Sequence, residues 1–297
     1  MIELLGKELR LELIDPINDR GRLGPRYCAG GYIWQVHDLK VGPLVTGPEW
    51  PHPNPEPFNG QGLPESFRHR TRAGKPLTWQ GLRGVSLGAG ELEQQPDGEV
   101  RITAPCVWEV TLKPDRVVFH TRQATLGFDY EIERNVVLQG RTIISETTLV
   151  NRSSSLLALE WFAHPFFALT DGEARVEVPA GSTLPENPGF NLHGHVITQK
   201  RRFLHLKDGH MDNLQLPART APTFHINHPT VAGVSFAVSF APDECLVWGN
   251  NATFSVEPYQ TLSLPPGDRR QWNVRYDFGA VSRTESPIAN ARTPARV

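Results

Sequence analysis

Two ionisable side chains lie inside apolar, β-favouring runs of the sequence. His164 lies within residues 161–167, and Glu257 lies within residues 254–260. Apolar surroundings disfavour a charged group, so they raise the pKa of a carboxyl group and lower the pKa of an imidazole. Both shifts move a group toward neutral pH, where acid–base catalysis works best. Glu257 and His164 are therefore a candidate general base and general acid.

Each of these residues also has a structural interpretation. A histidine in an apolar run is often a core residue whose ring nitrogens are hydrogen-bonded within the protein. A carboxylate in such a run is costly to bury and needs a partner, which can be a structural ion pair. The catalytic interpretation requires the fold to bring the two side chains to one cavity.

Alternation of polar and apolar residues predicts several β-strands. Residues 271–278 alternate strictly, which places Trp272, Val274, Tyr276 and Phe278 on one face. Residues 156–169 are apolar almost throughout, as expected of one strand that is covered on both faces. Further strands, either alternating or rich in β-branched residues, are predicted at residues 107–112, 117–121, 141–150 and 234–240.

These elements predict an all-β protein with a dozen or more strands. No segment shows a long helical period with caps at both ends. A large antiparallel β-sandwich is the natural way to bury so many half-apolar strands. No linker divides the chain, so we expect one domain over residues 1–297. The proline-rich residues 42–64 predict a long ordered loop, and the basic residues 67–75 follow it; such loops often line sites.

The composition narrows the class of protein. The formal net charge of −2 over 297 residues gives no basic excess for a nucleic-acid partner. No continuous apolar run approaches the roughly 18 residues of a membrane span. Residues 1–15 alternate charged and apolar types, unlike a secretory signal peptide. The three cysteines are widely spaced and fit a reducing compartment. We therefore expect a cytoplasmic protein that binds neither nucleic acid nor membrane.

Four segments, in order along the chain, resemble the galactose mutarotase-like superfamily, the aldose 1-epimerases and their relatives. Residues 24–33 are similar to the family's G-x-R-F-x-x-x-G-x-I strand pair, and residues 62–67 to its G-L-P-E-E-F segment. Residues 164–167 resemble the H-x-Y/F-F that holds the catalytic histidine. Residues 256–259, with 264–267 and Trp272, resemble the strand of the catalytic glutamate, the L-x-P-G turn and the final strand.

This resemblance covers almost the whole chain and implies a galactose mutarotase-like supersandwich with an open, concave sugar-binding face. It implies a mutarotase that interconverts sugar anomers, with Glu257 as the base and His164 as the acid on opposite sides of one pyranose-sized hollow. The reaction needs no cofactor and no metal. The partner would be a small-molecule sugar, and the protein would be a monomer or a homodimer. Substrate-binding side chains are expected at Arg26, Glu65, His69, Trp161 and Asp212.

The sequence also departs from the family pattern. Ala163 stands where aldose 1-epimerases have an asparagine, and the N-x-L-H-G-G segment with a further histidine is missing near residues 60–85, where His69 lies. Two alternatives therefore remain. One is a non-catalytic carbohydrate-binding or regulatory protein of the same fold. The other is an epimerase for a phosphorylated or acidic sugar, which the basic residues 68–75 favour.

Overall fold

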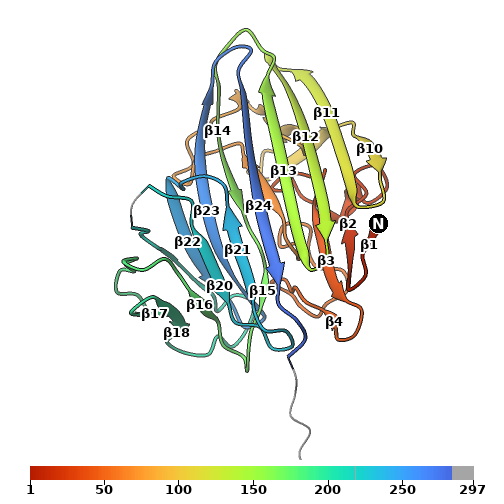
Figure 1. The fold of residues 1–297 in the computed structure, drawn as a ribbon. Coiled ribbons are helices and arrows are strands. Elements are labelled where there is room, and N and C mark those ends of the chain that lie inside the picture. Colours follow the sequence, from red (N-terminus) through yellow and green to blue (C-terminus); the bar gives the residue numbers. More distant parts are fainter. Residues whose placement is uncertain (218, 283–297) are drawn as a thin grey trace, which may run out of the picture.

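Antiparallel β-strands dominate the computed structural model, which describes residues 1–217 and 219–282 (Figure 1). The strands form four sheets. Within these two ranges the helical structure is one 3₁₀ turn, η1 (Arg20–Arg22). No helix of the described residues is long and apolar enough to cross a membrane. The all-β class predicted from the alternation pattern is confirmed.

The largest sheet has ten strands, of which β11, β12, β13 and β24 are long and run side by side in Figure 1. As predicted, Trp272, Val274, Tyr276 and Phe278 of β24 are all buried on one face. The order across this sheet is β10 (Glu109–Leu112), β11 (Arg116–Thr125), β12 (Phe128–Gln139), β13 (Thr142–Asn151), β24 (Arg269–Phe278), β21 (Val234–Val238), β20 (Thr223–Ile226), β16 (Arg175–Glu177), β18 (Val196–Gln199) and β17 (Phe190–His193).

A second sheet packs its inner face against the ten-stranded sheet. Its order is β19 (His210–Asn213), β22 (Glu244–Gly249), β23 (Thr253–Leu264), β14 (Leu157–Ala163) and β5 (Glu65–Arg68), and β15 (Phe167–Ala168) also pairs with β23. Trp161 of β14 meets Trp272 of β24 with ring centroids 5.3 Å apart, and Phe167 meets Phe236 of β21 at 5.8 Å. These contacts between sheets make the sandwich expected from the sequence.

The apolar run at residues 156–169 is two strands rather than the single strand predicted. β14 ends at Ala163 and β15 begins at Phe167. Pro165 lies in the gap, and Pro258 lies on the facing part of β23. Proline has no N–H for a ladder hydrogen bond, so the pairing with β23 is interrupted here. The N–H groups of His164 and Phe166 instead donate to the carbonyls of Pro64 and Gly62, at 2.9 and 2.8 Å.

Two small sheets complete the described part of the molecule. The first contains β1 (Ile2–Leu5), β2 (Leu9–Leu13), β3 (Ile33–Asp38) and β4 (Gly42–Pro43). The second contains β6 (Trp79–Gln80), β7 (Arg83–Ser86), β8 (Gly90–Gln94) and β9 (Val100–Pro105). The proline-rich segment runs from β4 to β5, so it connects the first small sheet to the edge of the six-stranded sheet.

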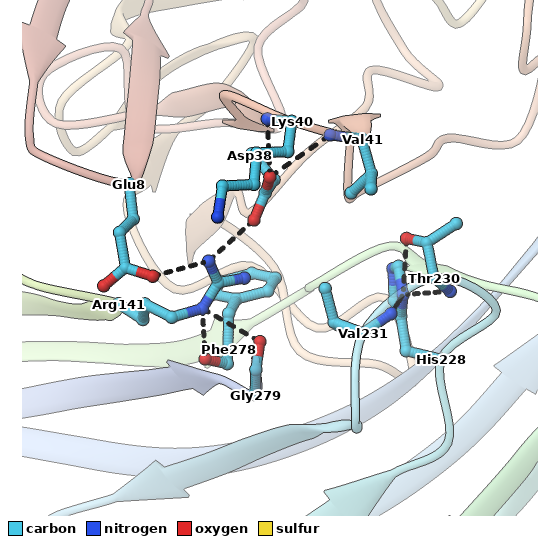
Figure 2. Close-up of polar contacts among 10 residues, drawn as sticks. All are labelled: Glu8, Asp38, Lys40, Val41, Arg141, His228, Thr230, Val231, Phe278 and Gly279. Atoms are coloured by element: carbon cyan, nitrogen blue, oxygen red, sulfur yellow. Dashed lines mark hydrogen bonds and ion pairs between the residues drawn. The ribbon is translucent and has the colours of Figure 1, made fainter. Parts of the chain in front are cut away.

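Arg141 fastens the first small sheet to one end of the ten-stranded sheet (Figure 2). Its guanidinium donates to the buried carboxylate of Asp38 at 2.6 Å and to the carbonyls of Phe278 and Gly279 at 3.0 and 2.9 Å. The backbone N–H of Lys40 donates to Asp38 Oδ1 at 2.8 Å. This clamp fixes the end of the small sheet from which the proline-rich segment departs toward the cleft described below.

Candidate active site

The strand register places His164 directly opposite Glu257. Phe162 pairs with Tyr259 before the interruption, and Phe167 pairs with Phe254 after it. Equal numbers of residues separate these pairs on the two strands, so His164 faces Glu257 across the gap. Because the backbone ladder is broken here, the two side chains form the cross-strand contact.

The two side chains form a direct pair at the floor of a cleft. His164 Nδ1 lies 3.0 Å from Glu257 Oε1, and each side chain is only 4% exposed. Ser255 Oγ also lies 3.1 Å from Nδ1, and the Tyr259 hydroxyl donates to Glu257 Oε2 at 3.0 Å. The expectation that a pyranose-sized hollow separates the pair is corrected. Facing positions on adjacent antiparallel strands are too close together to admit a sugar ring between their side chains.

The pKa shifts of the pair follow from its burial and its charges. Burial lowers the pKa of His164 and Arg26 adds to this, while the Glu257 carboxylate opposes it. Burial acts to raise the pKa of Glu257, but His164, Arg26 and the Tyr259 hydroxyl outweigh it, so the net direction is downward. The carboxylate is therefore held ionised. This is opposite to the upward shift that the apolar sequence context predicts, because the charged partners of Glu257, His164 and Arg26, are distant from it in sequence.

The cleft above the pair has a volume of about 1090 Å³. The long loop supplies Pro57, Phe58 and Asn59 to its wall, and strands of the six-stranded sheet supply its floor. Phe162 and Tyr259 lie beside the pair with parallel rings 4.4 Å apart, and Trp248 meets the His164 ring edge-on at 6.0 Å. Flat apolar faces next to polar groups are the combination that sugar rings require.

Among the predicted substrate-binding residues, Arg26 is the one whose charge acts on the pKa of both His164 and Glu257. Its guanidinium lies over the rings of Tyr27 and Phe58, at 5.3 and 5.0 Å from their centroids. Its side chain lines the cleft, and it forms no hydrogen bond or ion pair with residues 1–217 or 219–282. Its donors are therefore free for a ligand, beside the carboxylate whose pKa it lowers.

His69 also lines the cleft, on the segment that follows β5. The Trp79 indole N–H donates to its Nδ1 at 2.9 Å. Burial, with Arg70 and Arg68 beside it, lowers the pKa of His69 to about 4. The ring is therefore neutral, and because Nδ1 accepts, the remaining proton lies on Nε2.

Three other predicted substrate-binding residues lie outside this cleft: Glu65, Trp161 and Asp212. Successive side chains of a strand point to opposite faces, and the neighbours Ser66, Phe162 and Met211 are the ones that line the cleft. These three assignments are corrected, because each falls one position off the face that forms the site.

Glu65 belongs instead to a buried network between the sheets. It forms an ion pair with Arg134 of β12, and the Ser145 hydroxyl donates to its Oε1 at 2.7 Å. Arg134 also donates to the carbonyl of Gly30 at 2.9 Å. Trp161 is likewise fully buried against Trp272, and Asp212 lies 3.3 Å from His210 Nε2. These contacts give each residue a local partner.

Sequence reasoning did not assign Phe162, Phe58 or Met211 to the site. The signal for Phe162 was present, because it lies two positions from His164 and therefore on the same face. Phe58 and Met211 reach the cleft from a loop and from an edge strand, and no short-range pattern indicates this. No group of three or more His, Cys, Asp or Glu side chains suited to a metal ion occurs among the described residues.

Comparison with known proteins gives a consistent likeness at the level of structure alone. No protein-family model matches the chain, and no curated protein matches it. A galactose mutarotase-like protein from Lactobacillus casei aligns with a TM-score of 0.59 at 14% identity, covering 94% of this chain and 99% of that one. A galactose mutarotase related enzyme from Lactobacillus acidophilus aligns with a TM-score of 0.58 at 11% identity, covering 95% and 98%.

A galactose mutarotase-like protein from Clostridium acetobutylicum aligns with a TM-score of 0.56 at 12% identity, covering 94% of each chain. At such low identity the likeness concerns the fold and carries no activity. The resemblance in fold noted from four sequence segments is nevertheless confirmed by alignments that span nearly the whole chain. This protein has the galactose mutarotase-like fold.

Proposed function

We propose that the protein is an aldose 1-epimerase-like isomerase that interconverts the anomers of a sugar. Glu257 is the general base and His164 is the general acid. The observation that carries the proposal is the contact of 3.0 Å between His164 Nδ1 and Glu257 Oε1 at the floor of a cleft. Arg26, with no partner among the described residues, lies beside it and supplies hydrogen bonds to sugar hydroxyls.

The reaction consists of two proton transfers. The Glu257 carboxylate takes the proton of the anomeric hydroxyl, and the imidazolium of His164 gives a proton to the ring oxygen. The bond between C1 and the ring oxygen breaks as the C1 carbonyl forms. After rotation about the C1–C2 bond, the same transfers run in reverse and restore both side chains. Each transfer contributes a rate factor on the order of 10²–10⁴.

Direct contact between acid and base suits this chemistry. The anomeric hydroxyl and the ring oxygen are bonded to one carbon, so a neighbouring acid and base can reach both of them from one side. His164 Nδ1 faces Glu257, and Nε2 forms no hydrogen bond with the part of the chain that the structure describes. We therefore assign the transfer to the ring oxygen to Nε2–H.

The test measures the interconversion of pure α- and β-anomers by NMR for a panel of aldoses. Native protein should accelerate the exchange of at least one sugar. Glu257→Gln and His164→Asn should each lower that rate by about 10²–10⁴-fold. His225→Asn is the matched control, because His225 lies on β20 away from the cleft. Full activity in both cleft variants would remove the proposed roles.

A second candidate is a carbohydrate-binding protein without catalysis. It is favoured by the low exposure of the pair, whose side chains are each 4% exposed, and by Ala163 in place of asparagine. This candidate predicts sugar binding by calorimetry with no acceleration of anomer exchange for any sugar that binds. The same NMR panel separates the two candidates.

A further inference from the structure

The cleft carries an excess of positive charge in a chain whose formal net charge is −2. Five cationic side chains line it and three acidic ones, one of which is the proposed base. The cationic residues are Arg26, Arg68, Arg70, Arg72 and Lys207, and the acidic residues are Glu56, Glu99 and Glu257. Glu99 is mostly exposed, and it pairs at 3.0 Å with Arg101, a residue that does not line the cleft. A cleft with this balance attracts anions.

Of the three cleft-lining arginines at residues 68–72, Arg70 carries the least compensated charge within the described part of the chain. Arg68 pairs with Glu160 at 3.5 Å, and Arg72 pairs with Glu244. Arg70 has no carboxylate partner among residues 1–217 and 219–282. Its guanidinium stacks over the Trp79 ring at 4.3 Å and donates to the neutral amide oxygen of Gln94 at 3.2 Å. The side chain is thus positioned without being neutralised, which is the arrangement of an anion-binding arginine.

His69 adds a second donor next to Arg70. The Trp79 indole N–H occupies His69 Nδ1, so Nε2 carries the proton of the neutral ring. Trp79 therefore holds both side chains, the arginine by stacking and the histidine by a hydrogen bond. A guanidinium and an imidazole N–H that line the same cleft form a site for the oxygens of a carboxylate or a phosphate.

This basic arm, defined as Arg68, His69 and Arg70, begins close to the proposed catalytic pair. The Arg68 guanidinium lies 5.9 Å from the Tyr259 ring centroid, and the Tyr259 hydroxyl donates to Glu257 at 3.0 Å. Tyr259 is therefore the side chain that separates the base from the arm.

We propose that the cleft selects sugars that carry an anionic group, a carboxylate or a phosphate, and that the basic arm binds this group. The proposal rests on the proposed function for the position of the anomeric carbon. It assigns to the same site a substrate class, namely acidic or phosphorylated sugars rather than neutral ones. Arg70 and His69 are then specificity-determining residues at the end of the cleft remote from the bond that breaks.

The test is calorimetric binding of glucose, glucuronate and glucose 6-phosphate, each as its equilibrium mixture of anomers. Native protein should bind at least one anionic sugar about tenfold or more tightly than glucose, and the tighter of the two identifies the anion. Arg70→Gln should abolish this preference, because it should weaken binding of the anionic sugar much more than binding of glucose. Arg83→Gln, a matched exposed arginine on β7 outside the cleft, should keep it. Equal affinity for all three sugars, or a preference that survives Arg70→Gln, would overturn the proposal.

A second readout reports on the site without relying on affinity. The pKa of His69, about 4 in the free protein, should rise when an anionic sugar binds, because the anion offsets Arg68 and Arg70. NMR titration follows the imidazole protons, and His69→Gln identifies the His69 signal. Glucose should leave this pKa in place. A shift that glucose also produces, or no shift with any bound anionic sugar, counts against the basic arm.

These measurements separate the two proposals. Anionic preference without acceleration of anomer exchange would retain the basic arm and remove the isomerase. Acceleration for glucose, with no anionic preference, would retain the isomerase and remove the basic arm.

Discussion

The six-stranded sheet carries a buried charged pair on each of its faces. His164 and Glu257 lie on the outer face at the floor of the cleft, and Glu65 pairs with Arg134 on the inner face between the sheets. Exposure does not distinguish them, since all four side chains are at most 4% exposed. Burial of a charge is therefore common to a structural pair and a candidate catalytic pair.

The surroundings of the two pairs distinguish them. The Ser145 hydroxyl bridges Arg134 and Glu65, and Arg134 also donates to the Gly30 carbonyl. Both side chains lie within packed layers of the sandwich. The other pair borders a cleft of about 1090 Å³, beside the Arg26 guanidinium, which has no partner among the described residues. A buried charge indicates a functional site when a ligand can reach it and when nearby donors lack partners within the protein.

The largest expected effect tests the inner pair. Arg134→Met leaves the Glu65 carboxylate buried without a charged partner, so the free energy of unfolding should fall by about 3–5 kcal/mol. Chemical denaturation measures this change. Glu257→Gln on the outer face should change the same quantity by less than about 1 kcal/mol, because the amide keeps the shape of the residue and its direct partner His164, whose pKa burial lowers, can face it as a neutral ring.

A double variant sharpens this test. Glu65→Gln combined with Arg134→Met leaves no unpaired charge, so it should recover most of the stability lost by Arg134→Met alone. If Arg134→Met is no more harmful to stability than Glu257→Gln, the two faces do not differ as described.

The next effect concerns the outer pair and pH. As the acid, His164 must carry its proton, and burial places its pKa below the ordinary value of about 6.5. The pKa of Glu257 is also lowered, so its carboxylate remains ionised in the pH range in which His164 titrates. The value of kcat/KM should therefore fall as pH rises through the His164 pKa, approaching about tenfold per pH unit.

A profile that instead rises through this range would assign the base to neutral His164. The His164→Asn variant should show no such titration, which attributes the change to the pair. Because the two groups are in contact, the apparent pKa belongs to the pair as a unit.

The smallest effect concerns Tyr259, which joins the outer pair to the basic arm. Tyr259→Phe removes the hydroxyl that donates to Glu257 Oε2 at 3.0 Å and retains the ring that stacks on Phe162 at 4.4 Å. The loss of one hydrogen bond, about 0.5–1.5 kcal/mol, should lower kcat/KM by roughly 2- to 12-fold. Thermal unfolding should confirm that the variant is folded. An unchanged rate would mean that this hydrogen bond does not support the base.

The strands were predictable where side-chain alternation is local. The strict pattern of residues 271–278 appears as β24, with Trp272 and Tyr276 on its buried face. The prediction of one strand over residues 156–169 is wrong, since the apolar composition does not reveal the interruption that Pro165 makes opposite β23. Alternation could also have excluded Trp161, which lies an odd number of positions from His164 and therefore on the other face.

Residue types along the chain determined the strands, the all-β class and two ionisable residues in apolar surroundings. Tertiary structure alone decided that His164 faces Glu257, since that contact depends on the register between strands about 90 residues apart in sequence. It also decided that Glu65 meets Arg134 and that Arg26 meets no partner in the described residues. The reason is physical: a side chain's pKa and availability depend on the charges and donors that other strands bring to it, and sequence neighbours do not specify these.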